Sequence, residues 1–276
     1  MQNLSENKKS SFFYAFALLP KKKREAMNDF YSFAHLSDEI ADNSEKSIEE
    51  KKKEFEDWKE QFTLGLSGKS HLFLLNRIGE MISEFNLDVR IFHDLFAGME
   101  DDLNGKQIKT FADLEDYAYK VASTIGLVII EILGYKNPNE KKFAVNLGKA
   151  LQITNIMRDV KKDYLNSRIY LPEEILEQYG YSIKELAEFN YNEPFLHVMK
   201  SLDEKAHSFF NEAFTHFDSD DYGTLYPAVG MGRIYFELLN KIEKGNYNIF
   251  ANDFSVTKLK KLSIIFREII KGKIGL

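Results

Sequence analysis

Three observations predict that this protein is all-α. Apolar residues recur at three- and four-residue steps, most clearly across residues 30–41, 72–85, 145–160 and 228–242, which is the spacing of one helix face. There are five prolines, and none lies between Pro20 and Pro138, so a long stretch is free of the strongest helix breaker. Sustained apolar/polar alternation is scarce. We therefore expect helices in these stretches and no sheet.

Turn-forming residues divide the helical stretches at five places. These lie around residues 64–68, 134–139, 166–172, 190–194 and 218–223, and each contains glycine, proline or a run of small polar residues. None is long or repetitive enough to link two domains, and no fixed-period repeat indicates a solenoid. A chain of this length buries about three quarters of its unfolded surface. We expect residues 1–276 to form a single helical domain.

Composition excludes several classes of function. The net charge is −6, which argues against a nucleic-acid partner bound through overall positive charge. There is no cysteine, so disulfides, thiolate metal sites and Cys nucleophiles are excluded. The six histidines show no zinc-binding spacing.

The N-terminal region imitates a signal peptide only in part. Lys8 and Lys9 precede a short apolar run at residues 12–19, but the basic run 21–24 follows at once and no cleavage site is present. The longest apolar stretch, residues 125–130, is far shorter than the roughly 20 residues that span a bilayer. We expect a soluble, cytoplasmic protein, and peripheral contact with a membrane stays open as an addition.

The first group with possible chemistry is a pair of carboxylates. Asp38 and Asp42 are four residues apart, so a helix places them one turn apart on one face. Like charges at this spacing cost a few tenths of a kcal/mol, roughly, in an isolated helix, and a cation bound between them would reverse that cost. The alternative is an acidic face in contact with solvent.

A second group strengthens the metal interpretation. Asn155, Asp159 and Asp163 stand at i, i+4 and i+8 and form an oxygen ladder along one helix face. A separate apolar stripe runs beside it, made of Ile153, Ile156 and Val160. Mg²⁺ prefers such oxygen ligands and usually shares them with substrate phosphates. Two ladders facing each other across a cavity would suit a diphosphate held by Mg²⁺, whereas two unrelated acidic faces are the alternative.

Longer motifs carry a resemblance to a known family. They are Ser11-Phe-Phe-Tyr-Ala-Phe16, the Asp38/Asp42 motif, Gly98-Met-Glu-Asp-Asp102, Tyr117 to Gly126, Leu147 to Pro172 and Gly232-Arg-Ile-Tyr235. Over about residues 10–260 the chain resembles the squalene/phytoene synthases, and most closely the bacterial presqualene diphosphate synthases of hopanoid pathways. The resemblance implies an isoprenoid-synthase fold, with helices packed around a central apolar cavity.

The resemblance also assigns roles to residues. It implies Mg²⁺ and diphosphate binding by Asp38, Asp42, Asn155, Asp159 and Asp163. It places further residues around the phosphates or the prenyl chains: Ser11, Phe16, Tyr31, His35, Gln152, Arg158, Arg168, Tyr170, Tyr235 and Lys260. Tyr117 would stabilise cationic intermediates or manage proton loss. Alternatively, Tyr117 and Tyr235 are core tyrosines, and Arg168 and Tyr170 brace the loop before Pro172.

Three positions depart from the family pattern. His35 stands where an arginine is usual, Asn252 or Asp253 stands at a second arginine position, and Glu39 replaces an aspartate. A histidine lacks the fixed charge and the bidentate geometry of arginine. How a second diphosphate is held, and therefore which product leaves, stays open.

The resemblance implies a Mg²⁺-dependent prenyltransferase that joins two farnesyl diphosphates head to head into presqualene diphosphate, a precursor in squalene-type pathways to hopanoids or sterols. Phytoene or dehydrosqualene synthase, on the route to carotenoids, and a non-catalytic assembly factor are the alternatives. Isoprenoid diphosphates are the expected substrates, and downstream isoprenoid enzymes are possible partners. NADPH is possible but not indicated, because no G-x-G-x-x-G fingerprint is present.

The C-terminal segment has a composition of its own. It is rich in basic residues, with a single acid at Glu268: Lys258, Lys260, Lys261, Arg267, Lys271 and Lys273. Four apolar residues follow helical spacing: Leu259, Leu262, Phe266 and Ile269. The pattern predicts either a helix that lies on an anionic lipid surface or one whose apolar stripe packs on the core.

Overall fold

The computed structural model describes residues 19–43 and 45–274, and only the backbone of Asp42, Lys273 and Ile274. Its α-helices are α3 (Lys21–Asp42), α4 (Ile48–Gly65), α5 (Phe73–Glu84), α6 (Val89–Leu103), α7 (Phe111–Ala118), α8 (Thr124–Leu133), α9 (Glu140–Leu165), α10 (Glu173–Tyr179), α11 (Ile183–Ala187), α12 (Glu193–His216), α13 (Tyr222–Lys244) and α14 (Lys258–Ile274). A π-helix, η1 (Tyr119–Ser123), joins α7 to α8, and a 3₁₀ turn, η2 (Ser219–Asp221), precedes α13. These residues contain no strand, and the all-α prediction is confirmed.

Helix ends occur at all five predicted breaks. Local signals account for several of the helix starts, because side chains satisfy backbone N–H groups that the first turn leaves unpaired. Ser47, Thr110 and Ser182 each open a helix with a capping box, in which an acid three residues later bonds back to the cap residue. Asn192 caps α12, whose first turn contains Pro194, a position where proline costs no hydrogen bond.

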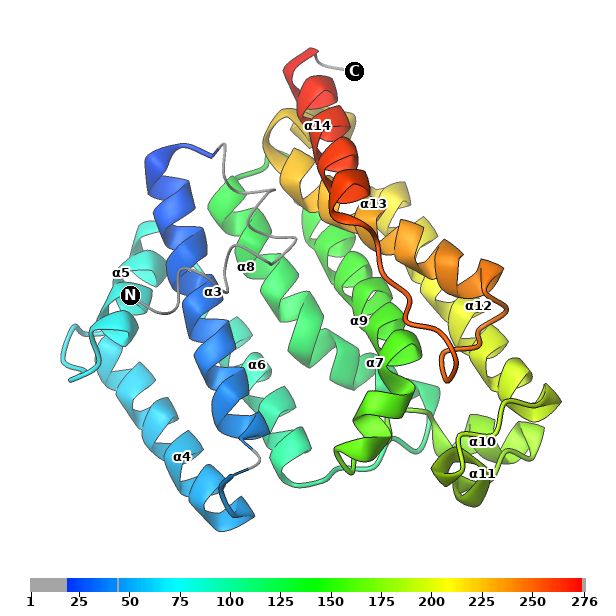
Figure 1. Ribbon diagram of the computed structural model, residues 1–276. Helices are drawn as coiled ribbons and strands as arrows, with labels where there is room; N and C mark the ends of the chain where they lie inside the picture. The colour runs from blue at the N-terminus through cyan, green and yellow to red at the C-terminus, as the bar shows by residue number, and fades with distance from the viewer. Residues whose placement is uncertain (1–18, 44, 275–276) are drawn as a thin grey trace.

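The helices α3, α8 and α9 lie side by side across the molecule (Figure 1). Helices α4 and α5 cover α3 on one side, whereas α12, α13 and α14 lie on the other side, next to α9 and beyond it. A cluster of aromatic rings fills the α3–α6 side; it includes Phe33, Phe62, Phe92 and Phe96. Buried residues of all these helices form one continuous hydrophobic cluster.

The sequence did not indicate the π-helix η1, which is held by close packing from two sides. A Cβ added to Gly98 of α6 would lie 2.7 Å from Cγ1 of Val121, and one added to Gly148 of α9 would lie 2.5 Å from Cα of Ser123. Both helices therefore press against η1 at positions where only glycine leaves enough room. Short π-helices of this kind occur frequently at functional sites.

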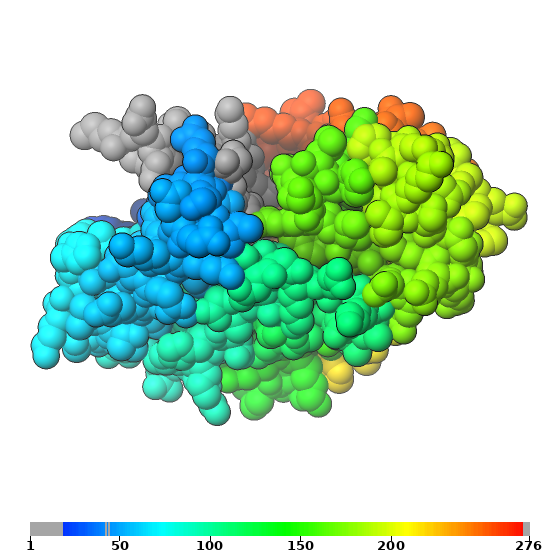
Figure 2. All heavy atoms as spheres, turned by 90° about the horizontal axis from the view of Figure 1, so that it is seen from below, coloured from blue at the N-terminus to red at the C-terminus, as the bar shows by residue number. Residues whose placement is uncertain are grey.

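Helices α3, α6 and α9 all end at the same side of the molecule, at the bottom of Figure 1. Figure 2 looks onto that side, where the α3–α4 segment (blue), the α6–α7 segment and the end of α9 meet. The acidic motifs at the ends of these three helices are thereby brought to one side. Among the described residues, every helix is too short or too polar to cross a membrane.

Candidate functional site

A hollow of about 320 Å³ opens between α3, α6, α8 and α9. Its polar lining consists of Tyr31, His35, Asp38, Asp102, Tyr117 and Gln152. The remaining walls are apolar: Met27, Phe30, Ala34, Leu95, Met99, Val121, Ile125 and Ile129. Five predicted site residues therefore line one hollow: Tyr31, His35, Asp38, Tyr117 and Gln152.

A second hollow, of about 200 Å³, adjoins the first between α8, α9 and α13. The two share four lining residues: Val121, Ile125, Ile129 and Gln152. The second hollow is mostly apolar, but Asn155 and Tyr235 also line it. We call the two hollows together the central cavity. An apolar interior with a polar end can take a ligand that has an apolar chain and a charged head.

The α3 side of the cavity carries the first acidic motif. Tyr31, His35 and Asp38 follow one another at three- and four-residue steps, so they face the cavity from one side of α3. The Nε2 atom of His35 lies 3.6 Å from Oε1 of Glu39, so two departures from the family pattern are neighbours. Ser11, Phe16 and the side chain of Asp42 lie outside the described part of the chain.

The α9 ladder supplies the second set of oxygens. The Oδ1 atom of Asn155 is buried and has no hydrogen-bond partner, an arrangement that is costly unless a ligand or ion completes it. Asp159 accepts hydrogen bonds from the Arg158 guanidinium, one of them at 2.8 Å. Burial, followed by the charge of Asp159, raises the pKa of the Asp163 carboxyl to about 7. Asp163 is thus partly desolvated. Of the three ladder residues only Asn155 lines a hollow of the cavity, and Asp159 and Asp163 line neither.

Asp102, at the end of α6, joins two tyrosines that the sequence had singled out separately. The Tyr117 hydroxyl donates to Oδ2 of Asp102 at 3.0 Å, and the Tyr170 hydroxyl donates to Oδ1 at 2.8 Å. The two rings are stacked, with centroids 4.8 Å apart. Burial, and then the charge of Asp102, raises the pKa of both phenols. Both therefore keep their protons, and Asp102 fixes where these protons point.

Sequence reasoning missed Asp102 as a site residue, although it closes the Gly98–Asp102 motif. Its partner Tyr170 returns to it because α9 ends at Leu165 and Ser167 takes up a positive φ of 60°. That turn sends the following segment back towards α6. The acidic motif and both tyrosines were visible in the sequence, but their hydrogen bonds to one another were not.

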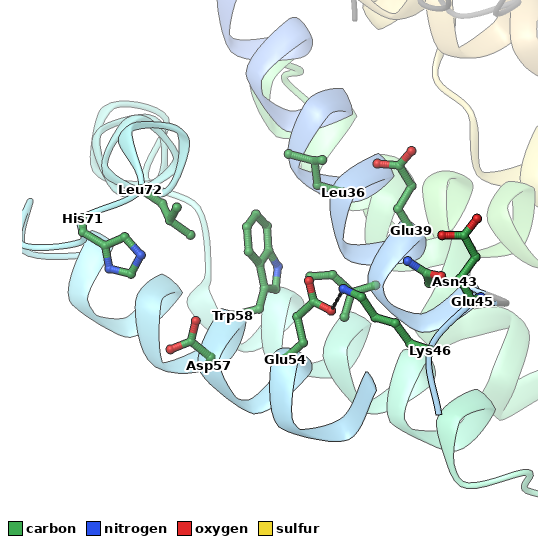
Figure 3. Close-up of a pocket in the computed structure, with 11 residues that line it drawn as sticks. Leu36, Glu39, Asn43, Glu45, Lys46, Glu54, Asp57, Trp58, His71 and Leu72 are labelled. Carbon is green, nitrogen blue, oxygen red and sulfur yellow. Dashed lines mark hydrogen bonds and ion pairs between the residues drawn. The ribbon is translucent and has the colours of Figure 1, made fainter. Parts of the chain in front are cut away.

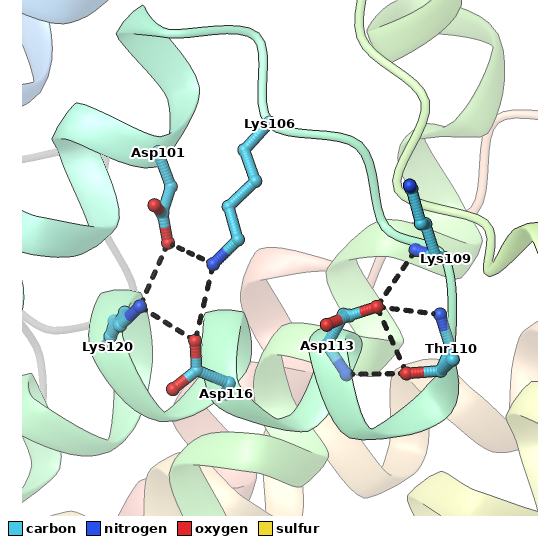
Figure 4. A network of polar contacts seen from close by, with 7 residues as sticks. All are labelled: Asp101, Lys106, Lys109, Thr110, Asp113, Asp116 and Lys120. Atoms are coloured by element: carbon cyan, nitrogen blue, oxygen red, sulfur yellow. Dashed lines mark hydrogen bonds and ion pairs between the residues drawn. The ribbon is translucent and has the colours of Figure 1, made fainter.

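Ion pairs beside the cavity hold α6 against α7 and η1 (Figure 4). The Lys120 ammonium lies 3.0 Å from Asp101 and 2.7 Å from Asp116, and Lys106 lies 2.9 Å from Asp101. These neighbouring acids raise the pKa of Lys120 despite partial burial. Because Asp101 precedes Asp102 and Asp116 precedes Tyr117, the network fixes the backbone on which the Asp102–Tyr117 pair depends.

The other predicted residues lie at varying distances from this centre. Tyr235 lines the cavity from α13. The pKa of Arg158 is raised mainly by its hydrogen bond to Asp159, and Tyr235 makes a smaller contribution. Arg168 is half-buried in the segment that follows α9. Lys260 lines neither hollow, and its Nζ lies 3.6 Å from Oε2 of Glu237 in α13. The roles of these residues stay predictions.

The donor set is compatible with Mg²⁺. Among the described side chains, no three histidines or acids form a ready-made metal site, and the side chain of the predicted ligand Asp42 lies outside them. Mg²⁺ usually completes its shell with water and substrate phosphate, which suits a partial set of this kind. The Oδ1 atom of Asn155 is buried without a partner, which fits a role as a ligand of the ion. Asp38, Asp159 and Asp163 are the carboxylates that would bind the same ion.

A larger hollow, of about 770 Å³, lies elsewhere, between the end of α3 and α4 (Figure 3). Leu36, Ile40, Trp58 and Leu72 form its apolar part. Acids dominate its edge: Glu39, Glu45, Glu54 and Asp57, with Lys46 and His71. Lys46 forms an ion pair with Glu54, and no buried polar group without a partner is found there among the described residues. Size alone therefore does not identify the site.

Known proteins give a consistent family assignment. The family profile described as squalene/phytoene synthase matches residues 6–262. The chain is 26% identical over 268 residues to a chloroplastic phytoene synthase of an Oncidium hybrid cultivar, covering 95% of this chain and 65% of that protein. It is 27% identical over 264 residues to the 15-cis-phytoene synthase of Synechococcus elongatus, covering 91% and 85%.

A crystal structure of a dehydrosqualene synthase superimposes with a TM-score of 0.83 and 25% identity, covering 99% of this chain and 95% of that one. The fold and the profile therefore agree over nearly the same residues. The chain spans somewhat less than two thirds of the length of the first plant relative but most of the bacterial one. This chain belongs to the squalene/phytoene synthase family.

Proposed function

We propose that this protein catalyses the Mg²⁺-dependent head-to-head condensation of two isoprenoid diphosphates. The observation that carries the proposal is the central cavity, which combines apolar walls with the oxygen ligands Asp38, Asp102 and Asn155 in its lining, the Oδ1 atom of Asn155 being buried. Prenyl chains would occupy the apolar part, and the diphosphates would lie against the ends of α3 and α9. The family assignment supports the same class of reaction.

The residues divide into two groups by what they would do. Asp38, Asn155, Asp159 and Asp163 would hold Mg²⁺ together with the substrate phosphates. Bound Mg²⁺ supplies positive charge that stabilises a departing diphosphate. Arg158, already paired with Asp159, would contribute a fixed positive charge beside the same group.

Loss of the diphosphate leaves an allylic cation, which must react with the double bond of the second substrate before water reaches it. The apolar walls, including Val121, Ile125 and Ile129, would keep water away. Tyr117 lines the same hollow and is held by Asp102. Its ring can attract a cation, an interaction worth about 0.5–2 kcal/mol. Closure of the cyclopropane ring of the proposed product would then release one proton.

For the product, we propose presqualene diphosphate from two farnesyl diphosphates. Phytoene synthesis from the longer geranylgeranyl diphosphate is the second candidate, and it is favoured by the names of the bacterial and plant relatives. Dehydrosqualene synthesis, which starts from farnesyl diphosphate, is favoured by the name of the structural neighbour. The three differ in chain length or in the fate of the cyclopropyl intermediate.

The test is an incubation of the purified protein with farnesyl or geranylgeranyl diphosphate. Each substrate is supplied with Mg²⁺ or with EDTA, and with or without NADPH, and products are identified by mass spectrometry. We expect Mg²⁺-dependent release of diphosphate and a C30 cyclopropyl diphosphate from farnesyl diphosphate. A C40 product would replace the first candidate by the second. If neither substrate releases diphosphate, the enzymatic proposal fails and the non-catalytic alternative gains support.

A further inference from the structure

Helix α14 has two apolar faces, and within residues 19–43 and 45–274 one of them packs on the protein while the other is exposed. Ile264, Ile265 and Glu268 are buried, and Gly230 of α13 allows Cδ1 of Ile265 to come so close that an added Cβ would lie 2.6 Å from it. The second face is exposed and consists of Leu259, Leu262, Phe266 and Ile270. These four stand at i, i+3, i+7 and i+11, so they share one side of the helix. We call this side the outer face of α14.

The outer face is strongly exposed. Leu259 is 81% exposed and Phe266 is 64% exposed, although large apolar residues normally lose most of their exposure in folded proteins. The sequence had grouped Ile269 with this stripe, but Ile269 is partly buried against the core and Ile270 takes its place. Of the four residues in the predicted stripe, only Ile269 therefore packs on the core, and the other three are exposed.

Basic residues surround this face. Helix α14 contains six basic residues and one acid, and exposed positions beside the stripe include Lys258, Lys260 and Arg267. The single acid, Glu268, is 0% exposed; it accepts hydrogen bonds from Tyr222 and from Arg267 on the inner side. No acid of α14 therefore offsets the positive charge at the outer face.

We propose that the outer face of α14 is a docking surface for an anionic membrane. A helix with an apolar stripe between basic residues lies at the lipid interface, where the stripe enters the headgroup region and the basic residues attract anionic lipids. A second copy of this chain is a poorer occupant, because a symmetric contact would bring Lys258 and Arg267 of both copies together. The proposal depends on α14 alone and not on the reaction proposed above.

The test is co-sedimentation of the full-length protein with vesicles. Vesicles of phosphatidylcholine alone are compared with vesicles that also contain phosphatidylglycerol, at low salt and at about 1 M salt, where the Debye length falls to about 3 Å. We expect binding to the anionic vesicles at least about tenfold stronger than to the neutral ones. High salt should remove most of that difference.

Matched variants locate the surface. The double variant Leu259→Ser/Phe266→Ser should lower binding about tenfold or more, because it removes the apolar stripe. Phe73→Ser is the control, since Phe73 is 76% exposed at the start of α5 and away from α14. Lys258→Gln/Lys271→Gln should lower binding to anionic vesicles about fivefold or more, whereas Lys52→Gln/Lys53→Gln in α4 should not. Circular dichroism checks that each variant is folded.

Three outcomes would overturn the proposal. The first is no binding of the intact protein to anionic vesicles at low salt. The second is equal binding by the Leu259→Ser/Phe266→Ser variant. The third is self-association of the wild type in sedimentation velocity that this variant abolishes while vesicle binding is unchanged, which would assign the outer face to a second copy of the chain.

Discussion

The hollow between α3 and α4 and the central cavity are both lined by apolar side chains and carboxylates, but the carboxylates are in different states. In the larger hollow, Glu45 and Asp57 are exposed, and Glu54 has a lysine partner. In the cavity lining, Asn155 has a buried oxygen without a partner, and two turns further along the same ladder Asp163 is partly desolvated. Exposed acids are stabilised by water, whereas desolvated ones need a cation or a proton.

Lining chemistry, and not volume, therefore distinguishes the candidate site from the larger hollow. The two hollows share helix α3, since Glu39 faces the larger one and Asp38 faces the cavity. Adjacent residues of one acidic motif therefore line different hollows. The following predictions test whether this difference is functional, beginning with the largest expected effect.

The first prediction concerns Asp38, which lines the cavity, and Asp159 of the α9 ladder. Asp38→Ala and Asp159→Ala should each lower kcat by about 10²–10³-fold or more, because each removes charge that would hold Mg²⁺ on the leaving diphosphate. Glu54→Ala, at the edge of the larger hollow, should stay within about twofold, as expected for an exposed ion pair. Steady-state rates at saturating Mg²⁺ measure both. Comparable losses in all three variants would remove the distinction between the hollows.

The second prediction uses Asn155. Asn155→Leu should lower activity by about 10²-fold, the cost of removing one well-placed polar group. The same change should raise the free energy of unfolding by about 1 kcal/mol, because an unsatisfied buried oxygen disappears. Asn43→Leu, in the larger hollow, should alter neither. Urea unfolding without ligand and kinetics on the same samples measure the two effects. A loss of both stability and activity would indicate that Asn155 has a structural role only.

The third prediction concerns Asp102, a positioning residue. Asp102→Asn should lower kcat about tenfold with little change in KM, because the two phenols donate to different carboxylate oxygens and asparagine replaces one of these oxygens by an NH₂ group that cannot accept. Tyr117 and Tyr170 should also ionise at lower pH, since the charge of Asp102 contributes to their raised pKa. Ultraviolet titration of tyrosine follows this change, and Asp57→Asn is the control. An unaltered titration together with unaltered kcat would show that the Asp102 contacts are incidental.

The smallest effect is expected at Glu140, a buried carboxylate that lines neither hollow. It is 0% exposed, and burial raises its pKa from 4.5 to about 7, with smaller contributions from Asp221 and Asp218. The pKa of Glu140 is higher in the folded state than in the unfolded state. Its contribution to the free energy of unfolding is therefore fully present below about pH 4.5 and is lost as pH rises through about 7. Wild-type stability should therefore fall across this window on account of Glu140.

Glu140→Gln should remove that dependence. At pH 8 the variant should be more stable than the wild type by about 1–3 kcal/mol, with no gain at pH 4.5 and unchanged kinetic constants. Thermal or urea unfolding across pH 4–8 measures the difference. Glu140 is a useful contrast to the carboxylates of the candidate site, because a carboxylate with a raised pKa outside the cavity should affect stability alone. A loss of activity in Glu140→Gln would link this end of α9 to the site.

The all-α class could be read from the sequence alone. Apolar periodicity predicted helix in four stretches, and the structure has helices there together with others that were not singled out; helix ends occur at all five predicted breaks. Five predicted residues line the first hollow, and Asn155 and Tyr235 line the second. These are local properties: residues three or four apart share a helix face whatever the rest of the chain does, so one helix's pattern can be read without its neighbours.

Which parts of the protein those helix faces contact depends on the tertiary structure. Asp102 and Tyr170 are 68 residues apart, and their contact depends on how α6 packs near the end of α9. The π-helix η1 exists where Gly98 and Gly148 bring α6 and α9 against it. In α14, two apolar faces were present in the sequence, and packing on α13 selected Ile264 and Ile265 for burial and left Leu259 and Phe266 outside. Such choices depend on shape complementarity between distant segments, which local spacing does not encode.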